Sequence, residues 1–255
     1  MISKTPFFSI ITASFNSEKT IKETIESVLH QTVTNFEYIL IDGKSSDKTV
    51  EIIQSFEKQF KEKKISYQWI SESDTGIYNA FNKGIKLAKG NWISFLGSDD
   101  IYLENALEFY KNKIEKLSTE IDFIHSKVQV ENGKMFANSF KWNKFKRKMT
   151  IAHVGGFHNK EYFIKYGLFN EAYKIAADYE LLLRAKDHLK TSWINELTVI
   201  MGNDGISNDQ IKKVYLETTK AKIETGNSTI FIAKMDYYVW MIKYQIKKLL
   251  YAFTK

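Results

Sequence analysis

The sequence predicts an α/β fold with a mainly parallel central sheet that is flanked by helices. Two observations lead to this fold class. Short apolar runs alternate with amphipathic runs of about a dozen residues through the first half of the chain, which is typical of strands joined by right-handed helical crossovers. Carboxylates follow several of the apolar runs. With 255 residues and 44% apolar content, the chain is long enough to bury a large core.

The first half of the chain predicts strands and helices in strict alternation. The strands are expected in apolar runs, and the helices where apolar residues such as Ile21 and Ile25 recur on one face. Ser17 is expected to cap the first helix, and Ser46 and Asp47 to open the second. The expected strands are 7–12, 36–41, 65–70 and 92–96, and the expected helices are 21–29, 47–60, 77–87 and 103–117.

The pattern changes after residue 120. Two apolar runs flank Asn132-Gly133, which predicts a hairpin. The expected later elements are strands 122–130 and 135–140, helix 178–188, strand 191–200, helix 209–226 and one long helix from Thr229. The predicted organisation is a domain over 1–209, with halves 1–118 and 119–209, followed by a helical extension over 210–255.

The last predicted helix carries two apolar and aromatic stripes with lysines between them. Its longest uncharged stretch, 237–242, is far too short to span a bilayer, which needs ~20 residues. The helix is therefore expected either to lie on a membrane surface or to pack on the protein or in a homodimer. One stripe is Phe231, Met235, Tyr238, Ile242, Ile246, Leu249 and Phe253, and the other is Tyr237, Trp240, Tyr244 and Tyr251.

Charge and composition narrow the classes of partner. The formal net charge is +7, and lysines gather at 141–148 and 234–255. This asymmetry indicates a nucleic acid, a phosphorylated substrate or an anionic membrane surface, unless the lysines only form a solvated surface. The chain has no cysteine, which excludes disulfides and thiolate chemistry and fits a reducing compartment. Residues 1–16 are expected to form neither a signal peptide nor a membrane-spanning helix.

Carboxylates stand where several predicted strands end or helices begin. They are Asp42, Asp74, the pair Asp99 and Asp100, and Asp178. The ends of parallel strands meet at one edge of a sheet, where such folds bind ligands, and a divalent metal or a ligand makes this much negative charge tolerable. Each carboxylate taken alone can instead cap a helix or form a turn.

Five motifs together resemble the inverting glycosyltransferase family 2, which has the Rossmann-like GT-A fold. They are SIITASFN at 9–16, FEYILIDGKSSDKT at 36–49, GIYNAFNKG at 76–84, FLGSDD at 95–100 and ADYELLLRA at 177–185. The resemblance covers residues 7 to 209. It implies transfer of a sugar, expected to be UDP-linked, to a glycan or a polyprenyl-diphosphate-linked acceptor in bacterial surface-polysaccharide synthesis. It implies no nucleic-acid partner. The halves 1–118 and 119–209 become the nucleotide-sugar side and the acceptor side.

The resemblance also implies a set of donor-binding residues. Asp42 matches the first acidic residue of the family's Val-Asp-Asp-Gly-Ser stretch and is expected to bond the base or ribose, whereas Gly43 stands in place of the second. Asp47 matches the later Asp of that stretch and is as fitting a helix cap as a ligand. The full set of expected nucleotide-binding residues is Thr12, Ser14, Asn16, Asp42, Asp74, Lys83 and Ser98.

FLGSDD matches the family's Asp-x-Asp metal motif, with Gly97 where the first Asp usually stands. Asp99 is expected to bind Mn²⁺ or Mg²⁺, which would bridge the two phosphates of the donor. Asp100 is either a further contributor through water or the cap of the next helix.

Asp178 matches the acidic residue that opens the family's acceptor-side helix, and it is the expected catalytic base. An inverting transfer needs one base to take the proton from the acceptor hydroxyl. Glu180 is expected to point away as a surface or supporting group, and Arg184 to be structural. His153 is a candidate for the acceptor or metal region, with a structural histidine as the alternative. The run NDGISND at 203–209 resembles a final loop that closes over the diphosphate.

Two other functions compete with glycosyl transfer. A sugar-phosphate nucleotidyltransferase would share the fold and the carboxylates but would need a glycine-rich loop after the first strand, and residues 13–16 contain no glycine. A degenerate sugar- or membrane-binding protein is suggested by Gly97, but the retained Asp42, Asp99 and Asp178 argue against it. The expected location is the cytoplasm, and a peripheral position on the inner face of the cell membrane is a further hypothesis.

Overall fold

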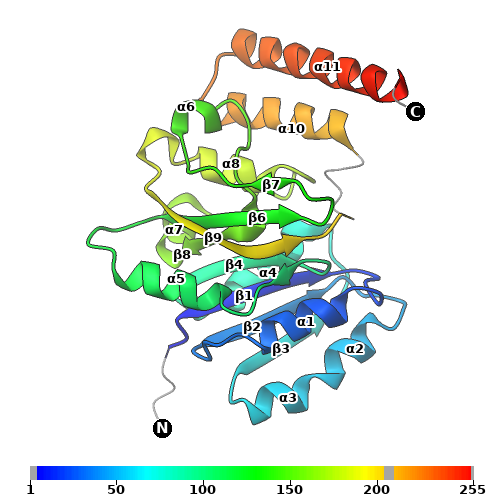
Figure 1. Cartoon of the computed structure of the whole chain (residues 1–255), viewed down its shortest axis with the longest axis vertical. Coiled ribbons are helices and arrows are strands. Elements are labelled where there is room, and N and C mark those ends of the chain that lie inside the picture. The colour runs from blue at the N-terminus through cyan, green and yellow to red at the C-terminus, as the bar shows by residue number, and fades with distance from the viewer. Residues whose placement is uncertain (1–4, 204–209, 254–255) are drawn as a thin grey trace.

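The computed structural model describes residues 5–203 and 210–253 of the chain. Within these ranges one nine-stranded mixed sheet runs in the order β3-β2-β1-β4-β8-β6-β9-β5, and β7 pairs with β6 (Figure 1). The strands are β1 (Phe8–Ser14), β2 (Phe36–Asp42), β3 (Ser66–Ser71), β4 (Trp92–Gly97), β5 (Ile101–Tyr102), β6 (Phe123–Val130), β7 (Met135–Phe136), β8 (Gly156–Asn159) and β9 (Thr191–Met201).

The first four strands pair in parallel, as the alternating pattern predicts. Ser14 lies opposite Asp42, and Asp42 lies opposite Ser71, so the carboxyl ends of β1, β2 and β3 are level. Ala13 pairs with Gly97 and brings the end of β4 to the same edge. The α/β fold class is confirmed, and this edge collects the polar residues that follow the strands.

Helices cover both faces of the sheet, and each face has its own core. On one face, α1, α2, α3 and α5 pack on residues such as Phe8 and Ile10, and on the other face α4, α7 and α8 pack on residues such as Ile11. Gly84 in α4 lets this helix approach β1, because a side chain there would collide with Ile11. These helices are α1 (Ile21–Leu29), α2 (Thr49–Ser55), α3 (Glu57–Glu62), α4 (Ile77–Leu87), α5 (Ala106–Glu115), α7 (Lys160–Tyr166) and α8 (Ala177–Leu183).

Several helix starts differ from the expectations. The cap position of α1 is Thr20 and not Ser17, whose hydroxyl instead contacts Ser98 Oγ at 2.8 Å. The helix expected over 47–60 is two helices that meet at Phe56. Asp100 does not cap the next helix. That helix, α5, begins only at Ala106, and its cap position is Asn105. Propensity places such boundaries only to within a few residues.

The second half adds strands from distant segments. The hairpin turn at Asn132-Gly133 is confirmed, and Gly133 has a positive φ of 85°, but β7 has only two residues where a strand to Phe140 was expected. Both β5 and β8 were missed because short strands that pair with remote segments leave little periodic signal. β8 joins the two halves, since it pairs antiparallel with both β4 and β6.

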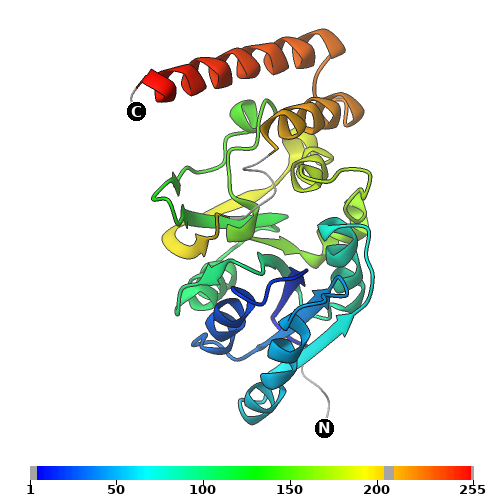
Figure 2. The same ribbon diagram turned by 90° about the vertical axis from the view of Figure 1, so that its right-hand side faces the viewer.

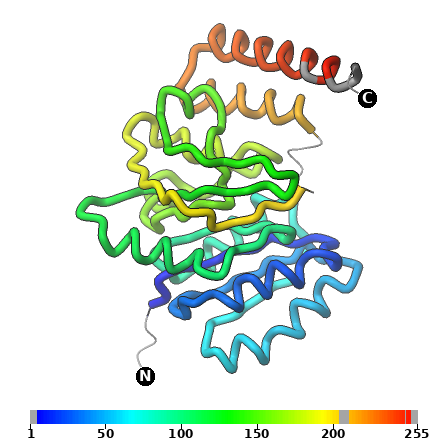
Figure 3. Tube along the Cα trace, in the orientation of Figure 1, coloured from blue at the N-terminus to red at the C-terminus, as the bar shows by residue number. Residues whose placement is uncertain are grey.

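Two helices follow the sheet, as predicted. They are α10 (Ile211–Glu224) and α11 (Ile230–Phe253), and short helical segments lie at α6 (Trp142–Phe145), η1 (His153–Gly155) and η2 (Lys186–His188). The helix expected over 178–188 ends at Leu183. Figures 1 and 2 show α10 between α11 and the rest of the molecule, and the tube in Figure 3 follows the chain from the β1–β3 end to α11 at the opposite end. Among the described helices, none is both long and apolar enough to cross a membrane.

Candidate active site

A cleft of about 760 Å³ opens at the carboxyl edge of the parallel strands. One wall comes from the segment after β1 and from the end of β4, where Gly97, Ser98 and Asp99 lie. The opposite wall comes from the start of α4 and from the segment before α8. The lining residues are Ala13, Ser14, Phe15, Asn16, Ser17, Glu18, Lys19, Thr20, Asp47, Asp74, Gly76, Ile77, Tyr78, Gly97, Ser98, Asp99, Lys174 and Ile175.

Asp42 is the centre of the hydrogen bonds beneath this cleft. Its carboxylate is fully buried and accepts the hydroxyl of Ser14 at 3.1 Å, the hydroxyl and amide of Ser45 at 2.6 and 2.9 Å, and the hydroxyl of Ser71 at 2.7 Å. These four donors come from three strand ends and occupy both carboxylate oxygens. For Asp42 to accept a hydrogen bond from a base or ribose, one of these four donors would have to move away.

Further hydrogen bonds tie the loops of this wall to one another. Asn16 has a positive φ of 48°, a conformation that asparagine tolerates, and its side-chain oxygen accepts the Ser46 amide at 2.9 Å. Asp47 accepts the amides of Glu18 at 3.1 Å and Thr49 at 3.0 Å and lines the cleft, whereas the cap position of α2 is Lys48. The wall is thus held rigidly by contacts between the loops after β1 and β2.

The structure divides the expected nucleotide-binding residues into two groups. Ser14, Asn16, Asp74 and Ser98 line the cleft. Thr12, Asp42 and Lys83 do not belong to its lining and lie behind it or beside it, as the next contacts show. Thr12 is buried and accepts the Tyr38 hydroxyl at 3.1 Å, and Lys83 forms an ion pair with Glu72 at 2.8 Å.

Asp74 contacts the loop before α4 but does not cap that helix, whose cap position is Gly76. Its Oδ1 accepts the Gly76 amide at 2.8 Å. Its Oδ2 lies where a side chain at Gly43 would start, since a Cβ added there would be 2.8 Å away. An acidic residue at 43 would therefore meet the Asp74 carboxylate, which gives a steric and electrostatic reason for the glycine at this position.

Asp99 and Asp100 occupy different surroundings at the end of β4. Asp99 lines the cleft, whereas Asp100 is buried and accepts the amides of Gly97 at 2.8 Å and Gly202 at 3.0 Å. Burial raises the pKa of Asp100 to about 7, and the neighbouring Asp99 carboxylate adds to the rise. A Cβ at Gly97 would lie 2.6 Å from Asp100 Oδ2, so this carboxyl group fills the space that a side chain at 97 would need.

This arrangement fits a divalent cation that a substrate helps to hold. Among the described residues, no three histidine, aspartate or glutamate side chains converge on one point that suits a metal ion. Mg²⁺ in phosphate-transfer sites is commonly held by one or two carboxylates together with the phosphates of the substrate. Asp99 in the cleft wall, with the carboxyl group of Asp100 beside it, can provide the one or two carboxylates of such a shared site. These residues do not provide enough ligands for a site made of protein groups alone.

Asp178 lies on the opposite side, at the start of α8. It is half-buried, and its Oδ1 accepts the hydroxyl of Tyr78 at 3.3 Å and the amide of Tyr179 at 2.8 Å. Tyr78 lines the cleft, so the Asp178 carboxylate is one side chain away from it. The Asp178 carboxylate also raises the pKa of His153, although burial has the larger effect and lowers that pKa overall.

His153 is a packed residue that contacts the structural core. Its ring stacks on Phe95 at 5.4 Å between centroids, and its Nε2 lies 2.8 Å from Nε2 of His158. These contacts agree with the alternative that His153 is a structural histidine. His153 is nevertheless close enough to Asp178 for the charge of that carboxylate to act on its pKa. His153 does not line the cleft where Asp99 lies.

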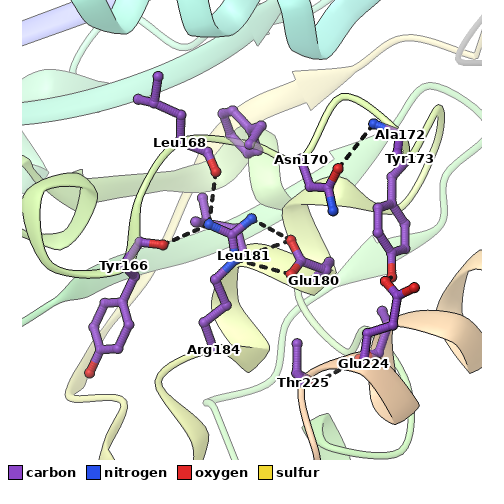
Figure 4. Close-up of polar contacts among 12 residues, drawn as sticks. Tyr166, Leu168, Asn170, Ala172, Tyr173, Glu180, Leu181, Arg184, Glu224 and Thr225 are labelled. Atoms are coloured by element: carbon purple, nitrogen blue, oxygen red, sulfur yellow. Dashed lines mark hydrogen bonds and ion pairs between the residues drawn. The ribbon is translucent and has the colours of Figure 1, made fainter.

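Glu180 is buried and does not lie on the surface. It forms an ion pair with Arg184, one turn further along α8, and the Arg184 guanidinium also donates to the carbonyls of Tyr166 at 2.7 Å and Leu168 at 2.8 Å (Figure 4). The surface interpretation of Glu180 is wrong, because its carboxylate is needed to balance a guanidinium that holds the loop after α7. The structural role expected of Arg184 agrees with these contacts.

Two residues of this side were not predicted from the sequence. Lys174 lines the cleft and donates its ammonium to the Thr75 carbonyl at 3.0 Å. Glu217 in α10 accepts the amides of Lys174, Ile175 and Ala176 at 2.8–3.1 Å, and so holds the segment that precedes Asp178. The position of Lys174 just before the ADYELLLRA motif was a usable signal, whereas nothing local marks Glu217. The expected closing loop at 203–209 lies outside the described residues from 204 onward.

The fold and the cleft define an α/β protein with its ligand site at the carboxyl edge of a parallel sheet, as in proteins that bind nucleotides. The family model named glycosyl transferase family 2 matches residues 9–173. The chain therefore belongs to glycosyltransferase family 2, and it is a glycosyltransferase. This finding confirms the family and the fold that the motifs predict.

Relatives and solved structures agree with this assignment. The chain is 27% identical over 233 residues to a PGL/p-HBAD biosynthesis glycosyltransferase of Mycobacterium bovis (strain BCG / Pasteur 1173P2), with 89% of each chain covered. It is 28% identical over 222 residues to an Escherichia coli chondroitin synthase, which covers 85% of this chain and 32% of that protein.

Two solved structures share the fold. S. aureus TarS 1-349 in complex with UDP-GlcNAc superposes with a TM-score of 0.70 at 18% identity, covering 90% of this chain and 70% of that one. The mannosyltransferase PcManGT from Pyrobaculum calidifontis, in complex with GDP-Man and Mn²⁺, gives 0.67 at 11% identity, covering 92% and 70%.

Proposed function

We propose that this glycosyltransferase transfers a sugar from a nucleotide-diphospho-sugar with inversion at the anomeric carbon. The observation that carries the proposal is the cleft with Asp99 on one wall and Tyr78 in contact with Asp178 on the other. A donor lying across the cleft would have its diphosphate near Asp99 and its sugar toward Asp178. The proposed donor is UDP-linked, since the structural relatives crystallised with nucleotides include TarS with UDP-GlcNAc.

The wall formed by the loops after β1 and β4 is the proposed nucleotide site. Ser14, Asn16 and Ser98 line this wall, and Asp74 lines the cleft from the loop before α4; together they offer hydroxyl, amide and carboxylate groups to the base, ribose and phosphates. Thr12, Asp42 and Lys83 support this wall from behind through the hydrogen bonds and the ion pair described above. Lys19 and Lys174 in the lining place positive charge beside the phosphates.

Asp99 is the proposed ligand of Mn²⁺ or Mg²⁺. When bound, such a cation would supply positive charge to the diphosphate that leaves. Asp100 is fixed by two backbone amides, and its carboxyl group and that of Asp99 both lie beside Gly97, so we assign Asp100 a supporting role next to Asp99 and no contact with the donor itself.

Asp178 is the proposed general base. As the acceptor oxygen forms its bond to the anomeric carbon, the bond from that carbon to the phosphate oxygen breaks and its electron pair stays with the nucleoside diphosphate. The acceptor proton passes to the Asp178 carboxylate. The Tyr78 hydroxyl and the Tyr179 amide hold this carboxylate in place.

The proposed acceptor is a glycan or a polyprenyl-diphosphate-linked glycan of a bacterial surface polysaccharide. Support comes from the relatives, whose names place them in PGL/p-HBAD biosynthesis and in chondroitin synthesis. The proposed location is the cytoplasm, which agrees with a chain that contains no cysteine.

A donor panel tests the proposal. UDP-, GDP- and dTDP-sugars are incubated with the protein in Mn²⁺, Mg²⁺ or EDTA, and the released nucleotide is identified. We expect slow release of UDP that needs a divalent cation and falls roughly a hundredfold in Asp99→Ala, because the charge of the leaving diphosphate would lose its protein-held cation. Asp187→Ala, at an exposed acidic residue, is the matched control.

Three outcomes would contradict this proposal in distinguishable ways. Release of pyrophosphate in place of a nucleoside diphosphate would identify a nucleotidyltransferase. Donor binding without turnover for any sugar, even with added acceptors, would indicate a non-catalytic binding protein. Full activity in EDTA would show that no metal ion is required, and Lys19 and Lys174 would then be the candidates for the positive charge at the phosphates.

A further inference from the structure

The outer face of α11 is a continuous apolar surface that no described part of the chain covers. Six residues at helical spacing share this face, with exposed fractions between 48% and 78%. They recur every three or four residues, which places them on one side of a helix with ~100° between successive residues. We call them the outer stripe, and they are Phe231, Met235, Tyr238, Ile242, Ile246 and Leu249.

Packing against α10 prevents the outer stripe from turning inward. Asp236 on the opposite side of α11 is 2% exposed and forms ion pairs with Lys222 of α10 at 3.0 Å and with Arg147 at 2.5 Å. Trp240 packs near Tyr215 of α10, at 6.4 Å between ring centroids. Tyr237, Trp240 and Tyr244 of the second predicted stripe are partly buried on the side of α11 that faces α10, and Figures 1 and 2 place α11 at the outer end of the molecule.

Cations lie beside the outer stripe. Lys234, Lys243 and Lys248 are exposed on α11, at angles that place them on both flanks of the stripe. The basic run at 141–148 also reaches this helix, since Lys148 lies over the Trp240 ring at 4.4 Å. The two lysine-rich segments of the sequence therefore meet on one surface.

Negative charge is missing from the same helix surface. The sequence of α11 contains a single acidic residue, Asp236, and that carboxylate is buried between two cations. A second copy of this face would bring lysines against lysines with no exposed carboxylate on either helix to pair them, which opposes self-association. Exposed apolar patches of this kind commonly mark protein or membrane contact sites.

We propose that α11 lies flat on an anionic membrane surface. The outer stripe would enter the boundary between headgroups and acyl chains, and Tyr238 would sit at the level of the headgroups, where amphipathic aromatic rings are favoured. Lys234, Lys243 and Lys248 would contact lipid phosphates. Since α10 carries both Lys222, which anchors α11, and Glu217, which holds the segment before Asp178, docking would set the acceptor side of the cleft beside the membrane.

Vesicle flotation of the full chain tests this proposal without any sugar substrate. Vesicles of phosphatidylcholine alone are compared with vesicles that also contain phosphatidylglycerol, at low and at high salt. We expect the protein to float only with the anionic vesicles and to be released by salt. Ile242→Glu should reduce partitioning roughly tenfold or more, because an apolar side chain that would enter the membrane is replaced by a charge.

Matched variants separate this surface from general effects. Ile164→Glu makes the same change on α7, where Ile164 is 71% exposed compared with 59% for Ile242, and it should float like the unmodified protein. Lys234→Gln, Lys243→Gln and Lys248→Gln together should reduce partitioning at least about tenfold. The triple change Lys22→Gln, Lys58→Gln and Lys61→Gln, at exposed lysines of α1 and α3, should leave it unchanged. Thermal melts confirm that each variant is folded.

Two results would overturn the proposal. One is equal and weak flotation of the unmodified protein with both kinds of vesicle. The other is a dimer in light scattering that Ile242→Glu converts to a monomer while flotation stays the same, since a second copy would then cover the outer stripe. Flotation requires no donor or acceptor, so either result would leave the proposed transferase activity to be judged on its own assay.

Discussion

The two walls of the cleft are built in different ways. The nucleotide-side wall is assembled from the ends of neighbouring parallel strands and is held by Asp42, whose four donors come from segments within one sheet edge. The wall on the proposed acceptor side is formed by the start of α4 and by the segment before α8, and this segment is held by Glu217 on α10 and by Tyr78 on α4. The position of the first wall is set by the strands of the sheet, whereas the position of the second wall depends on contacts with helices from other parts of the chain.

This difference suggests how the enzyme separates two tasks. A nucleotide is a constant ligand, and a wall made of consecutive strand ends suits it because the strands fix the backbone of every loop. The acceptor-side wall contacts α10, which in turn carries α11 and its exposed outer stripe. Changes in the last two helices can therefore reach the proposed base without altering the nucleotide wall, and the two walls should respond separately to mutation.

The largest separation is expected from Asp178→Asn. Asparagine keeps the size of the side chain but cannot accept the acceptor proton, so transfer should fall by ~10² to 10⁴. The dissociation constant for the nucleotide should stay within about threefold, because the nucleotide wall is untouched. Initial rates of sugar transfer and calorimetric titration with UDP measure the two quantities.

Asp187→Asn is the control for this change, since Asp187 is exposed beyond the end of α8. More than about a tenth of the original rate in Asp178→Asn would mean that another group is the base. His153, which lies close enough for the Asp178 charge to act on its pKa, would be next in line, while Glu180 is occupied by Arg184.

A smaller effect is expected from Glu217→Ala. Three successive amides, those of Lys174, Ile175 and Ala176, would lose their acceptor. The segment before Asp178 should then shift by a fraction of an ångström or more, which lowers kcat roughly tenfold to a hundredfold. Glu217 is a positioning residue in this view, and Glu217→Gln, which keeps one acceptor oxygen, should recover part of the rate.

The readout for Glu217 must separate positioning from stability. We expect kcat to fall while the UDP dissociation constant and the melting temperature of Glu217→Gln stay close to the original values. Leu216→Ala, at the exposed neighbouring position on α10, is the control and should be neutral. Equal losses of kcat and of nucleotide affinity would show that the two walls are not independent.

The sequence predicted the nucleotide wall better than the acceptor wall for a physical reason. A parallel strand is a short apolar run, and the residues after it mark a place at the sheet edge, so Asp42 was located from local pattern. Ser14 and Ser98 were implied by the family resemblance. The register of β1, β2 and β3 then made those ends level. That Asp42 would be enclosed by three serines depends on side chains from three segments, and no local pattern contains this information.

The acceptor wall depends on contacts that span longer stretches of chain. Glu217 lies about forty residues beyond the amides it accepts, on a helix whose apolar pattern is weak. Glu180 was expected to point away on its helix as a surface or supporting group, and its burial depends on Arg184 and the loop after α7. Asp100 was expected either to contribute through water or to cap the next helix, whereas the amide of Gly202 in a remote segment fixes it.

The smallest predicted effect concerns the stability of the fold in acid. It is expected to arise beneath the acceptor-side wall and not beneath the nucleotide wall. Three histidines lie in the core beneath the acceptor side, and burial lowers the pKa of each: that of His125 to about 4, and those of His153 and His158 below their usual range. Neither ring nitrogen of His125 has a hydrogen-bond partner among the described residues, and the centroid of its ring lies 4.8 Å from that of the Trp193 ring. The unfolded chain binds protons at these groups near pH 6.5, where the folded chain does not.

The free energy of unfolding should therefore decrease as the pH falls below about 6.5, and for His125 the loss should continue to about pH 4. His125→Phe keeps an aromatic ring and removes the titration, so at pH 5.5 it should lessen the acid-induced loss by about 1 kcal/mol. Denaturant melts at pH 7.5 and 5.5 measure this, and His188→Phe, at an exposed histidine, should not change the difference. An unchanged pH dependence in His125→Phe would contradict this prediction. It would mean that acid destabilises the protein through other groups, such as the carboxylates of the nucleotide wall, and not through the buried histidines beneath the acceptor side.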